Sequence, residues 1–420
     1  MSGALIQLVA YGTLDNYLIG DDIKLFKIGF LRHSNFSIEP IELTFNDSVD
    51  FNTRRVIKIL KNGDLLGPLF LKATLPVITS VDSSVESRWV NRVGFCLLRK
   101  VELKIGGQTI DQLYSTWMHI WSELTFTKNK KAALSKMIGT KGSNGKSEGL
   151  LTDTNHVLII PLLFSFCRHF SLAIPLISLE YNEIELIFDF ETLENCYSVD
   201  NTINQTTNSL TGSLTDVSLI TNYIYIDPIE KENFATNTHE YLIETLQVAT
   251  ENYQVESNKI NKVPLILYHP IKEIYWVIKK DSNLKGDKFT DFTKNAVHIN
   301  SINIDDVWYY NSGISGTINS FKEASILINE IKKIKTSNQK YFNFIQPYQH
   351  HTGYPDIGIN CYSFSLYPEK HHPSGTINCT KINKIDIELY SHVEGKIIVY
   401  GLGYNILKIK SGFGTLVYQN

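Results

Sequence analysis

Short strand-like segments separated by turn residues are the feature of this 420-residue chain that most restricts its fold. Ile184–Phe190 (IELIFDF), Ile385–Tyr390 (IDIELY) and Lys396–Tyr400 alternate, or nearly alternate, apolar and polar side chains. Successive side chains of a strand point to opposite faces, so this pattern predicts strands with one buried face. Short spacing between such segments favours a β-sandwich or barrel over βαβ units. The 22 Tyr, 21 Phe and 5 Trp agree, because aromatic rings pack well on pleated sheets.

Two glycine-containing dipeptides mark expected hairpins. Asn62-Gly63 lies between two apolar-rich runs in Arg54–Leu75, and Gly106-Gly107 interrupts a similar pair of runs in Leu98–Ile110. Both dipeptides supply residues that tolerate the positive φ angles of a tight turn. The sequence therefore predicts that the flanking strands pair at each position.

Helical patterns are few. Asp111–Phe126 places Leu113, Trp117 and Trp121 near one face at helical spacing, which predicts a helix whose aromatic rings face the core. Pro228–Leu246 is a second, more polar candidate near the middle of the chain, and we expect it to connect two strand-rich domains of roughly 225 and 180 residues. The two halves share no visible residue-level identity, so the sequence gives no evidence of a duplicated fold.

Polar and glycine-rich stretches predict exposed loops at 128–149 and 195–215. Within the first, Gly139–Ser147 (GTKGSNGKS) looks like a phosphate-binding loop, but the glycine spacing is one residue too long and no buried strand precedes it. Gly401–Leu407 (GLGYNIL) begins like a dinucleotide-binding motif, but Ile406 stands where the third glycine belongs. We expect a flexible loop at the first and a strand with glycines at bends in the second.

Histidines occur as two adjacent pairs, His350-His351 and His371-His372, with Asp356 and Cys361 nearby in the sequence. Adjacent residues of a strand or loop point in different directions, so each pair offers one metal ligand at best. The chain also lacks an HExxH pattern. The sequence predicts polar loop and turn residues here, and no metal site.

No catalytic residue and no cofactor site is predicted either. No serine lies in a GxSxG nucleophile elbow, since the matching string at Gly145–Gly149 (GKSEG) stands in the polar loop, and the cysteines have no paired or zinc-binding spacing. Scattered cysteines of this kind indicate free, mostly buried thiols in a reducing compartment. They are Cys96, Cys167, Cys196, Cys361 and Cys379.

The formal net charge is only −3, and a protein that grips nucleic acid through phosphates usually carries a basic excess. We therefore expect no direct binding to nucleic acid. The N-terminus lacks the order of a signal peptide, and the most apolar run, Val157–Phe166, is too short to span a bilayer. These features predict a soluble protein made in the cytoplasm.

Four Asn-x-Ser/Thr sequons are candidate glycosylation sites. A protein that is not secreted does not meet the usual glycosylation machinery, so we expect most of them to be unmodified. They are Asn35, Asn46, Asn204 and Asn378.

Seven stretches, in order from residue 3 to residue 420, carry a resemblance to one family. They are Gly3–Tyr17, Phe26–Phe45, Pro161–Phe190, Tyr223–Gln247, Tyr268–Val277, Tyr362–Asn383 with its Pro-Ser-Gly-Thr element, and Asn405–Asn420. Together they resemble the major capsid proteins of nucleocytoplasmic large DNA viruses, such as iridoviruses, phycodnaviruses and marseilleviruses. Departures from the family pattern lie mainly in the two polar loops and at Asp227-Pro228.

This resemblance implies an all-β fold of two consecutive eight-stranded antiparallel jelly rolls, with a few short helices in loops and between domains. The implied organisation is an N-terminal segment at 1–22 on the inner capsid side, a first jelly roll at 23–226 and a connector at 227–240. A second jelly roll with the C-terminal tail would follow at 241–420.

The implied function is that of a structural major capsid protein and not an enzyme. Three copies would form a homotrimeric capsomer of pseudo-hexagonal outline that tiles the icosahedral shell of a large double-stranded DNA virus. Its partners would be neighbouring capsomers, minor capsid and penton proteins, and an internal viral membrane reached by the inner face. The protein would be located in the capsid shell of the virion, after synthesis and assembly in the host cytoplasm.

Two alternatives remain at this stage. One is a minor capsid paralogue of the same family. The other is a jelly-roll protein that binds carbohydrate, which would need a metal or an exposed aromatic platform. Trp276, Trp308 with Tyr309-Tyr310, or Tyr341 with Phe342 could form a platform, but we expect these to be buried strand aromatics.

Overall fold

The computed structural model describes residues 33–78, 87–143, 146–199, 211–280, 319–355 and 358–418, together with Ile6 and Phe292. Residues 37–420 form one compact unit, and the residues before them form another. The predictions for segment 1–22, for Asn204, for Asp356 and for Trp308–Tyr310 concern positions outside the described residues.

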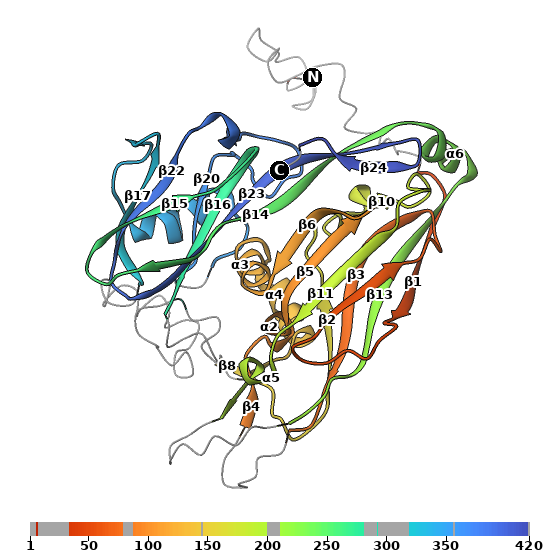
Figure 1. The fold of residues 1–420 in the computed structure, drawn as a ribbon, viewed down its shortest axis with the longest axis horizontal. Helices are drawn as coiled ribbons and strands as arrows, with labels where there is room; N and C mark the ends of the chain where they lie inside the picture. The colour runs from red at the N-terminus through yellow and green to blue at the C-terminus, as the bar shows by residue number, and fades with distance from the viewer. Residues whose placement is uncertain are drawn as a thin grey trace. The chain divides into compact units, whose positions relative to one another are not determined.

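The first half of the compact unit contains two antiparallel sheets (Figure 1). One sheet has the order β1 (Phe36–Thr44), β13 (Thr215–Ile226), β3 (Leu65–Leu75) and β10 (Ile174–Pro175), and β9 (His156–Pro161) pairs with β3 beside β10. The other has the order β2 (Arg54–Ile59), β11 (Ile184–Phe190), β5 (Leu98–Ile105) and β6 (Gln108–Tyr114).

The second half contains another two sheets. One has the order β14 (His239–Val255), β23 (Gly395–Lys410), β16 (Pro270–Lys279) and β20 (Asn360–Ser363), and it is extended by β21 (Ile377–Asn378) and β24 (Phe413–Leu416). The other has the order β15 (Ile260–Leu265), β22 (Ile385–Ser391), β17 (Phe321–Ile328) and β18 (Ile331–Lys332), and β19 (Ser337–Asn338) also pairs with β17.

The same topology occurs twice. If the eight main strands of each half are numbered in chain order, both halves have one sheet in the order 1-8-3-6 and a second in the order 2-7-4-5. Short consecutive pieces serve as one strand where they pair with the same neighbour, as β9 and β10 do with β3. Two four-stranded antiparallel sheets with this connectivity form a jelly roll. The predicted double jelly roll is therefore confirmed, and so is a duplication that the sequence does not show.

Shorter elements fill the connections. The helices are α2 (Val93–Leu97), α3 (Ser115–Thr125), α4 (Lys128–Met137), α5 (Leu193–Cys196), α6 (Pro228–Thr236) and α8 (Gln346–His350), with single helical turns η2 (Ser165–Cys167), η3 (Phe170–Leu172), η7 (Tyr341–Ile345) and η8 (Cys379–Lys381). In the part of the chain that the structure describes, two small two-stranded sheets pair β4 (Ser87–Trp89) with β12 (Tyr197–Val199) and β7 (Thr140–Ser143) with β8 (Lys146–Gly149). Among the described residues, no helix has the length and apolar character needed to cross a membrane.

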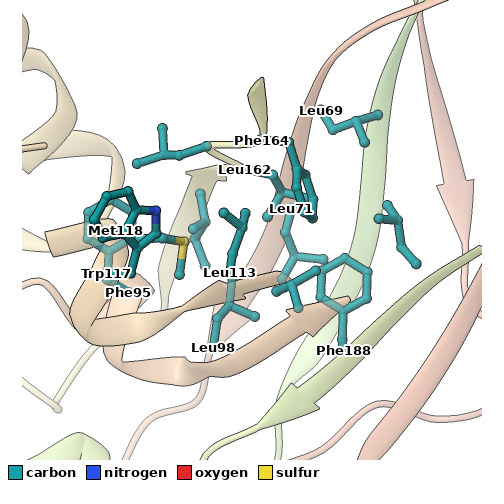
Figure 2. Close-up of a cluster of buried hydrophobic side chains, with 14 of the residues drawn as sticks. Leu69, Leu71, Phe95, Leu98, Leu113, Trp117, Met118, Leu162, Phe164 and Phe188 are labelled. Carbon is teal, nitrogen blue, oxygen red and sulfur yellow. The ribbon is translucent and has the colours of Figure 1, made fainter. Parts of the chain in front are cut away.

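Each jelly roll buries its own core. In the first, Leu71 of β3 and Phe188 of β11 meet between the sheets, and Trp117 of α3 lies beside Phe95 of α2 (Figure 2). In the second, the ring of Trp276 lies 5.0 Å from that of Phe342, edge to face. Full burial of such a side chain stabilises the fold by roughly 2–3 kcal/mol, so these interiors hold the sheets together.

One of the two expected hairpins is wrong. Gly106-Gly107 does join paired strands, with φ angles of +57° and +81° and Ile105 opposite Gln108. The strands around Asn62-Gly63 do not pair, because β2 belongs to one sheet and β3 to the opposite one. A Cβ on Gly63 would lie 2.8 Å from the Cβ of Tyr223, so this glycine lets the connection between β2 and β3 approach β13 closely and does not form a tight hairpin turn.

The predicted helices are too long, and one predicted loop contains regular secondary structure. Residues 111–114 belong to β6, and the helix starts only at Ser115. The mid-chain helix ends at Thr236, and 239–246 belong to the long strand β14, because pairing with β23 outweighs local helical spacing. The side chain of Asp227 caps this helix by accepting a hydrogen bond from Ile229 N at 3.1 Å, with Pro228 in its first turn. Likewise the expected loop 128–149 contains α4 and the strands β7 and β8.

Candidate functional site: the junction between the two jelly rolls

A set of buried and partly buried residues joins the two jelly rolls, and we call it the junction. It comprises Asp111, Trp117, Glu123 and Arg168 from the first jelly roll, and Glu244, Leu246, Lys272, Tyr275, Gly353 and Tyr400 from the second. No catalytic group is predicted for this chain. The contacts that hold one pair of sheets against the other are therefore its candidate functional feature.

Strand β16 makes the junction possible because both of its faces are buried. Ile274 and Trp276 belong to the core of the second jelly roll, while Tyr275 and Val277 belong to the core that continues from the first. The register against β23 shifts between Ile271 and Glu273. A bulge of this kind re-aims side chains, and here it allows neighbouring charged residues to reach the junction.

A buried ion-pair chain crosses the junction. Arg168, which follows η2, forms an ion pair with Glu244 of β14, and Lys272 Nζ donates to Glu244 Oε1 at 2.5 Å. Lys272 also donates to the carbonyl of Pro368 at 2.6 Å. The Arg168 guanidinium lies 3.9 Å from the ring centre of Trp121. The side chains of Lys272 and Glu244 are 0% and 4% exposed, so the ion pair is shielded from solvent.

The charges of Arg168, Glu244 and Lys272 depend on one another. Burial alone would raise the pKa of Glu244, but the Lys272 and Arg168 cations lower it below the usual value. Burial lowers the pKa of Lys272, and Glu244 opposes that shift. Removing one of the three side chains would leave the others as buried charges without a partner, which would lower the free energy of unfolding.

Asp111 of β6 joins the two jelly rolls through the backbone. Its carboxylate accepts hydrogen bonds from Leu246 N of β14 at 3.0 Å and from Gln112 N at 2.9 Å. Burial raises the pKa of Asp111 to about 7, although both amides favour the charged form. The carboxyl group therefore changes its charge near neutral pH.

Aromatic rings form the apolar part of the junction. The ring of Trp117 in α3 lies 4.9 Å from that of Tyr275 in β16 and 5.7 Å from that of Tyr400 in β23. Tyr114 of β6 contacts Tyr400 at 6.0 Å. Because edge-to-face and tilted rings attract each other beyond simple burial, these contacts favour one orientation of the two sheet pairs.

A second polar group ties α3 and α4 to the second jelly roll. Glu123 pairs with Arg92 and, at 2.7 Å, with Lys131, whose Nζ also donates to the carbonyl of Tyr354. Gly353 N donates to the carbonyl of Leu124 at 2.7 Å. Burial would raise the pKa of Glu123, but Arg92 and Lys131 lower it to about 2, so this carboxylate stays charged.

The C-terminal strand pair adds a third connection. Gly414 N donates to Asn182 Oδ1 at 3.0 Å, and Leu416 N donates to Gln108 Oε1 at 3.2 Å. Tyr181 stacks at a tilt on Phe413, with ring centres 5.2 Å apart. The end of the second jelly roll is thus held by the first.

The two histidine pairs are not all exposed loop residues. The side chain of His351 is 0% exposed, and its two ring nitrogens contact Glu273 Oε1 at 2.7 Å and Glu369 Oε1 at 3.1 Å. Burial alone would lower the pKa of His351, but the Glu273 carboxylate raises it well above the usual value. The prediction of a polar loop residue is wrong for His351, because the loop after α8 folds inward against β16. His350 and His371 are partly buried and His372 is exposed.

The other candidate residues are placed as follows. The three described sequon asparagines, Asn35, Asn46 and Asn378, are exposed. The cysteines Cys96, Cys196, Cys361 and Cys379 are free and buried, and Cys167 is free and partly buried. Trp276 and Phe342 are fully buried, which removes them from any sugar platform, and Gly401 and Gly403 lie in β23 as expected.

Sequence reasoning missed every charged residue of the junction. A usable signal exists in Pro270–Lys279 (PIKEIYWVIK), where Lys272 and Glu273 interrupt an otherwise apolar run. A continuous apolar run indicates a strand covered on both faces, so charges inside it must be buried and paired. Their partners, Glu244 and His351, are distant in sequence and cannot be chosen from it.

Comparisons with known proteins agree over the whole chain. Two family models match, "Major capsid protein N-terminus" over residues 24–227 and "Large eukaryotic DNA virus major capsid protein" over residues 230–415. The major capsid proteins of Phaeocystis pouchetii virus and Pyramimonas orientalis virus are 35% and 33% identical, over 100% of this chain and 100% of each relative. The structure of the PBCV-1 virus capsid matches with a TM-score of 0.78 and 26% identity, over 94% of this chain and 100% of that one.

The duplicated topology and the buried junction define a double jelly-roll protein of the class found in viral shells. Within that class, the chain belongs to the major capsid proteins of large eukaryotic DNA viruses. Its relatives are structural proteins of the virion, and it is accordingly a structural protein and not an enzyme.

Proposed function

We propose that three copies of this chain form a homotrimeric capsomer of pseudo-hexagonal outline, and that these capsomers tile an icosahedral shell. The observation that carries the proposal is the repeated 1-8-3-6 and 2-7-4-5 topology within one chain. Three chains would supply six similar sheet pairs, which is the number that a roughly hexagonal ring needs.

The junction supports this role. A ring closes only if the angle between its units is constant, and buried ion pairs and interlocked rings hold that angle better than a flexible linker would. The Arg168–Glu244–Lys272 chain and the Trp117–Tyr275 contact supply such a constraint inside each chain. Large subunit interfaces would then join the chains as an obligate unit.

The remaining assignments follow from family membership. We propose segment 1–22 as the part on the inner capsid side, jelly rolls at 23–226 and 241–420, and a connector at 227–240. Neighbouring capsomers, minor capsid and penton proteins, and an internal viral membrane would be the partners. Assembly would take place in the host cytoplasm, without direct contact with nucleic acid.

The test is the mass of the purified protein by light scattering after size-exclusion chromatography, with negative-stain images of the same peak. Three chains of 47.9 kDa give about 144 kDa. A peak at that mass with hexagonal outlines supports the capsomer. A monomer at both low and high protein concentration contradicts it.

A further inference from the structure

Three side chains with metal-binding atoms converge on the junction face of β16. They are Glu273 of β16, His351 after α8 and Cys361 of β20, and their ligand atoms all lie within 4.8 Å of one another. Strand pairing explains two of them, since Tyr275 stands opposite Cys361 and Glu273 lies two residues earlier on the same strand. The side chains of Glu273 and His351 are 0% exposed, and Cys361 is fully buried.

The donor set suits a zinc ion. Zn²⁺ prefers a thiolate, an imidazole nitrogen and a carboxylate oxygen, at bonds of about 2.0–2.3 Å, which places tetrahedral ligand atoms about 3.3–3.8 Å apart. His351 Nε2 and Glu273 Oε1 are now 2.7 Å apart, a hydrogen-bond distance, so a small outward shift of either group would admit the ion. Water would take the fourth position, as it does in other three-ligand zinc sites.

Neighbouring groups already orient these ligands. Glu369 Oε1 lies 3.1 Å from His351 Nδ1, the nitrogen that would not face the metal. Tyr275 Oη donates to Glu273 Oε2 at 2.6 Å, which leaves Oε1 for the ion. Glu369 is fixed in turn by Thr352, whose backbone N donates to it at 2.8 Å. A carboxylate behind a histidine and a donor behind a ligating carboxylate are the supports that zinc sites use.

Charge also balances. Zinc ligands bind as a thiolate, a neutral imidazole and a carboxylate, so binding of Zn²⁺ would release the Cys361 thiol proton and any proton on His351 Nε2 to solvent. The ion and its three ligands would then contain one dication, two anions and a neutral imidazole, so their net charge would be zero. A buried site tolerates an ion only when its charge is compensated in this way.

We propose that Glu273, His351 and Cys361 form a buried zinc site with three protein ligands. The site would tie the loop after α8 and strand β20 to strand β16. Because Tyr275 of the same face contacts Trp117, the ion would stiffen the second jelly roll where it meets the first. This inference concerns each chain by itself and does not depend on the proposed trimer.

The experiment measures zinc in the full chain by mass spectrometry of the metal, after treatment with a chelator, equilibration with Zn²⁺ and gel filtration. We expect about one zinc per chain, and a loss of affinity of about 10- to 100-fold or more in His351→Gln and Cys361→Ser. Matched controls are His350→Gln, next to the site, and Cys379→Ser, another buried thiol of the same jelly roll. Both should retain zinc.

A wild-type chain that retains no zinc above background overturns the proposal, and so does equal zinc retention in Cys361→Ser and Cys379→Ser. If the ligand variants do not fold, Co²⁺ replaces Zn²⁺ in the wild-type chain. Thiolate-to-cobalt absorption in the near ultraviolet then supports a cysteine ligand. Its absence shows that the three residues are only a hydrogen-bonded ionic cluster.

Discussion

Single buried charges decide how firmly this capsid protein holds its two halves together. Asp111 is a clear case, because its carboxylate bridges to the backbone of β14 from a site where burial favours the neutral form. The pKa of an ordinary unfolded Asp is near 3.9, and that of Asp111 in the folded chain is about 7. The stability that protonation supplies is complete below about pH 4 and is lost as the pH rises through 7.

Asp111→Asn should remove this pH dependence. The amide oxygen of Asn can still accept from Leu246 N and Gln112 N, but it has no proton to lose. We expect the unfolding free energy of the wild type to fall between about pH 4 and 7 relative to the variant, by up to a few kcal/mol. Urea unfolding at several pH values measures it. Parallel pH curves for the two proteins would show that Asp111 does not titrate there.

At the scale of elements, the sequence predicts strands far better than it predicts their partners. Ile184–Phe190 is β11 with the same bounds, and Ile385–Tyr390 falls one residue short of β22, because alternation is a local property. The sequence predicts a helix over Pro228–Leu246, but residues 239–246 form the start of β14. Pairing with β23 decides the outcome, and that pairing is not encoded locally.

A substitution at Gly63 tests whether this glycine is needed for close approach to β13. Gly63→Ala would place a Cβ 2.8 Å from the Cβ of Tyr223, so the connection before β3 and strand β13 would have to shift apart. We expect a loss of unfolding free energy of about 1–3 kcal/mol from overpacking. Tyr223 is held by its hydroxyl, which donates to the carbonyl of Leu60 at 2.6 Å, and cannot simply move aside.

Gly107→Ala is the matched comparison. No atom lies within 4 Å of a Cβ there, but the φ angle is +81°, so its cost should be backbone strain of about 1–2 kcal/mol. Full stability of Gly63→Ala, measured by thermal unfolding, would contradict the close approach.

At the scale of the whole molecule, family resemblance and physics contribute different things. The resemblance implied two jelly rolls and a capsid function, while composition alone indicated only a β-rich protein without an active site. Neither identified the junction, because Arg168, Glu244 and Lys272 come from three separate segments. Contacts between distant segments need coordinates, and here they explain how two domains act as one building unit.

Glu244→Gln should loosen that unit. It would leave Lys272 and Arg168 buried without an anion, and the expected loss of unfolding free energy is about 3–5 kcal/mol. Glu240→Gln on the same strand is the control, because its pair with Lys408 is exposed and should contribute less than about 1 kcal/mol. Urea unfolding measures both losses. Equal losses of unfolding free energy in the two variants would show that the buried ion pairs stabilise the fold no more than a surface ion pair does.

The two jelly rolls share a topology but not a sequence, and this difference has a geometric consequence. The proposed ring of three such chains would have a six-sided outline, yet alternate corners would be chemically distinct, so a sixth of a turn would not restore it. Each capsomer would therefore have one of two orientations within a flat sheet. Neighbours with the same orientation would extend a facet, and neighbours with opposite orientations would form a boundary between facets, so one kind of subunit would be enough to build both.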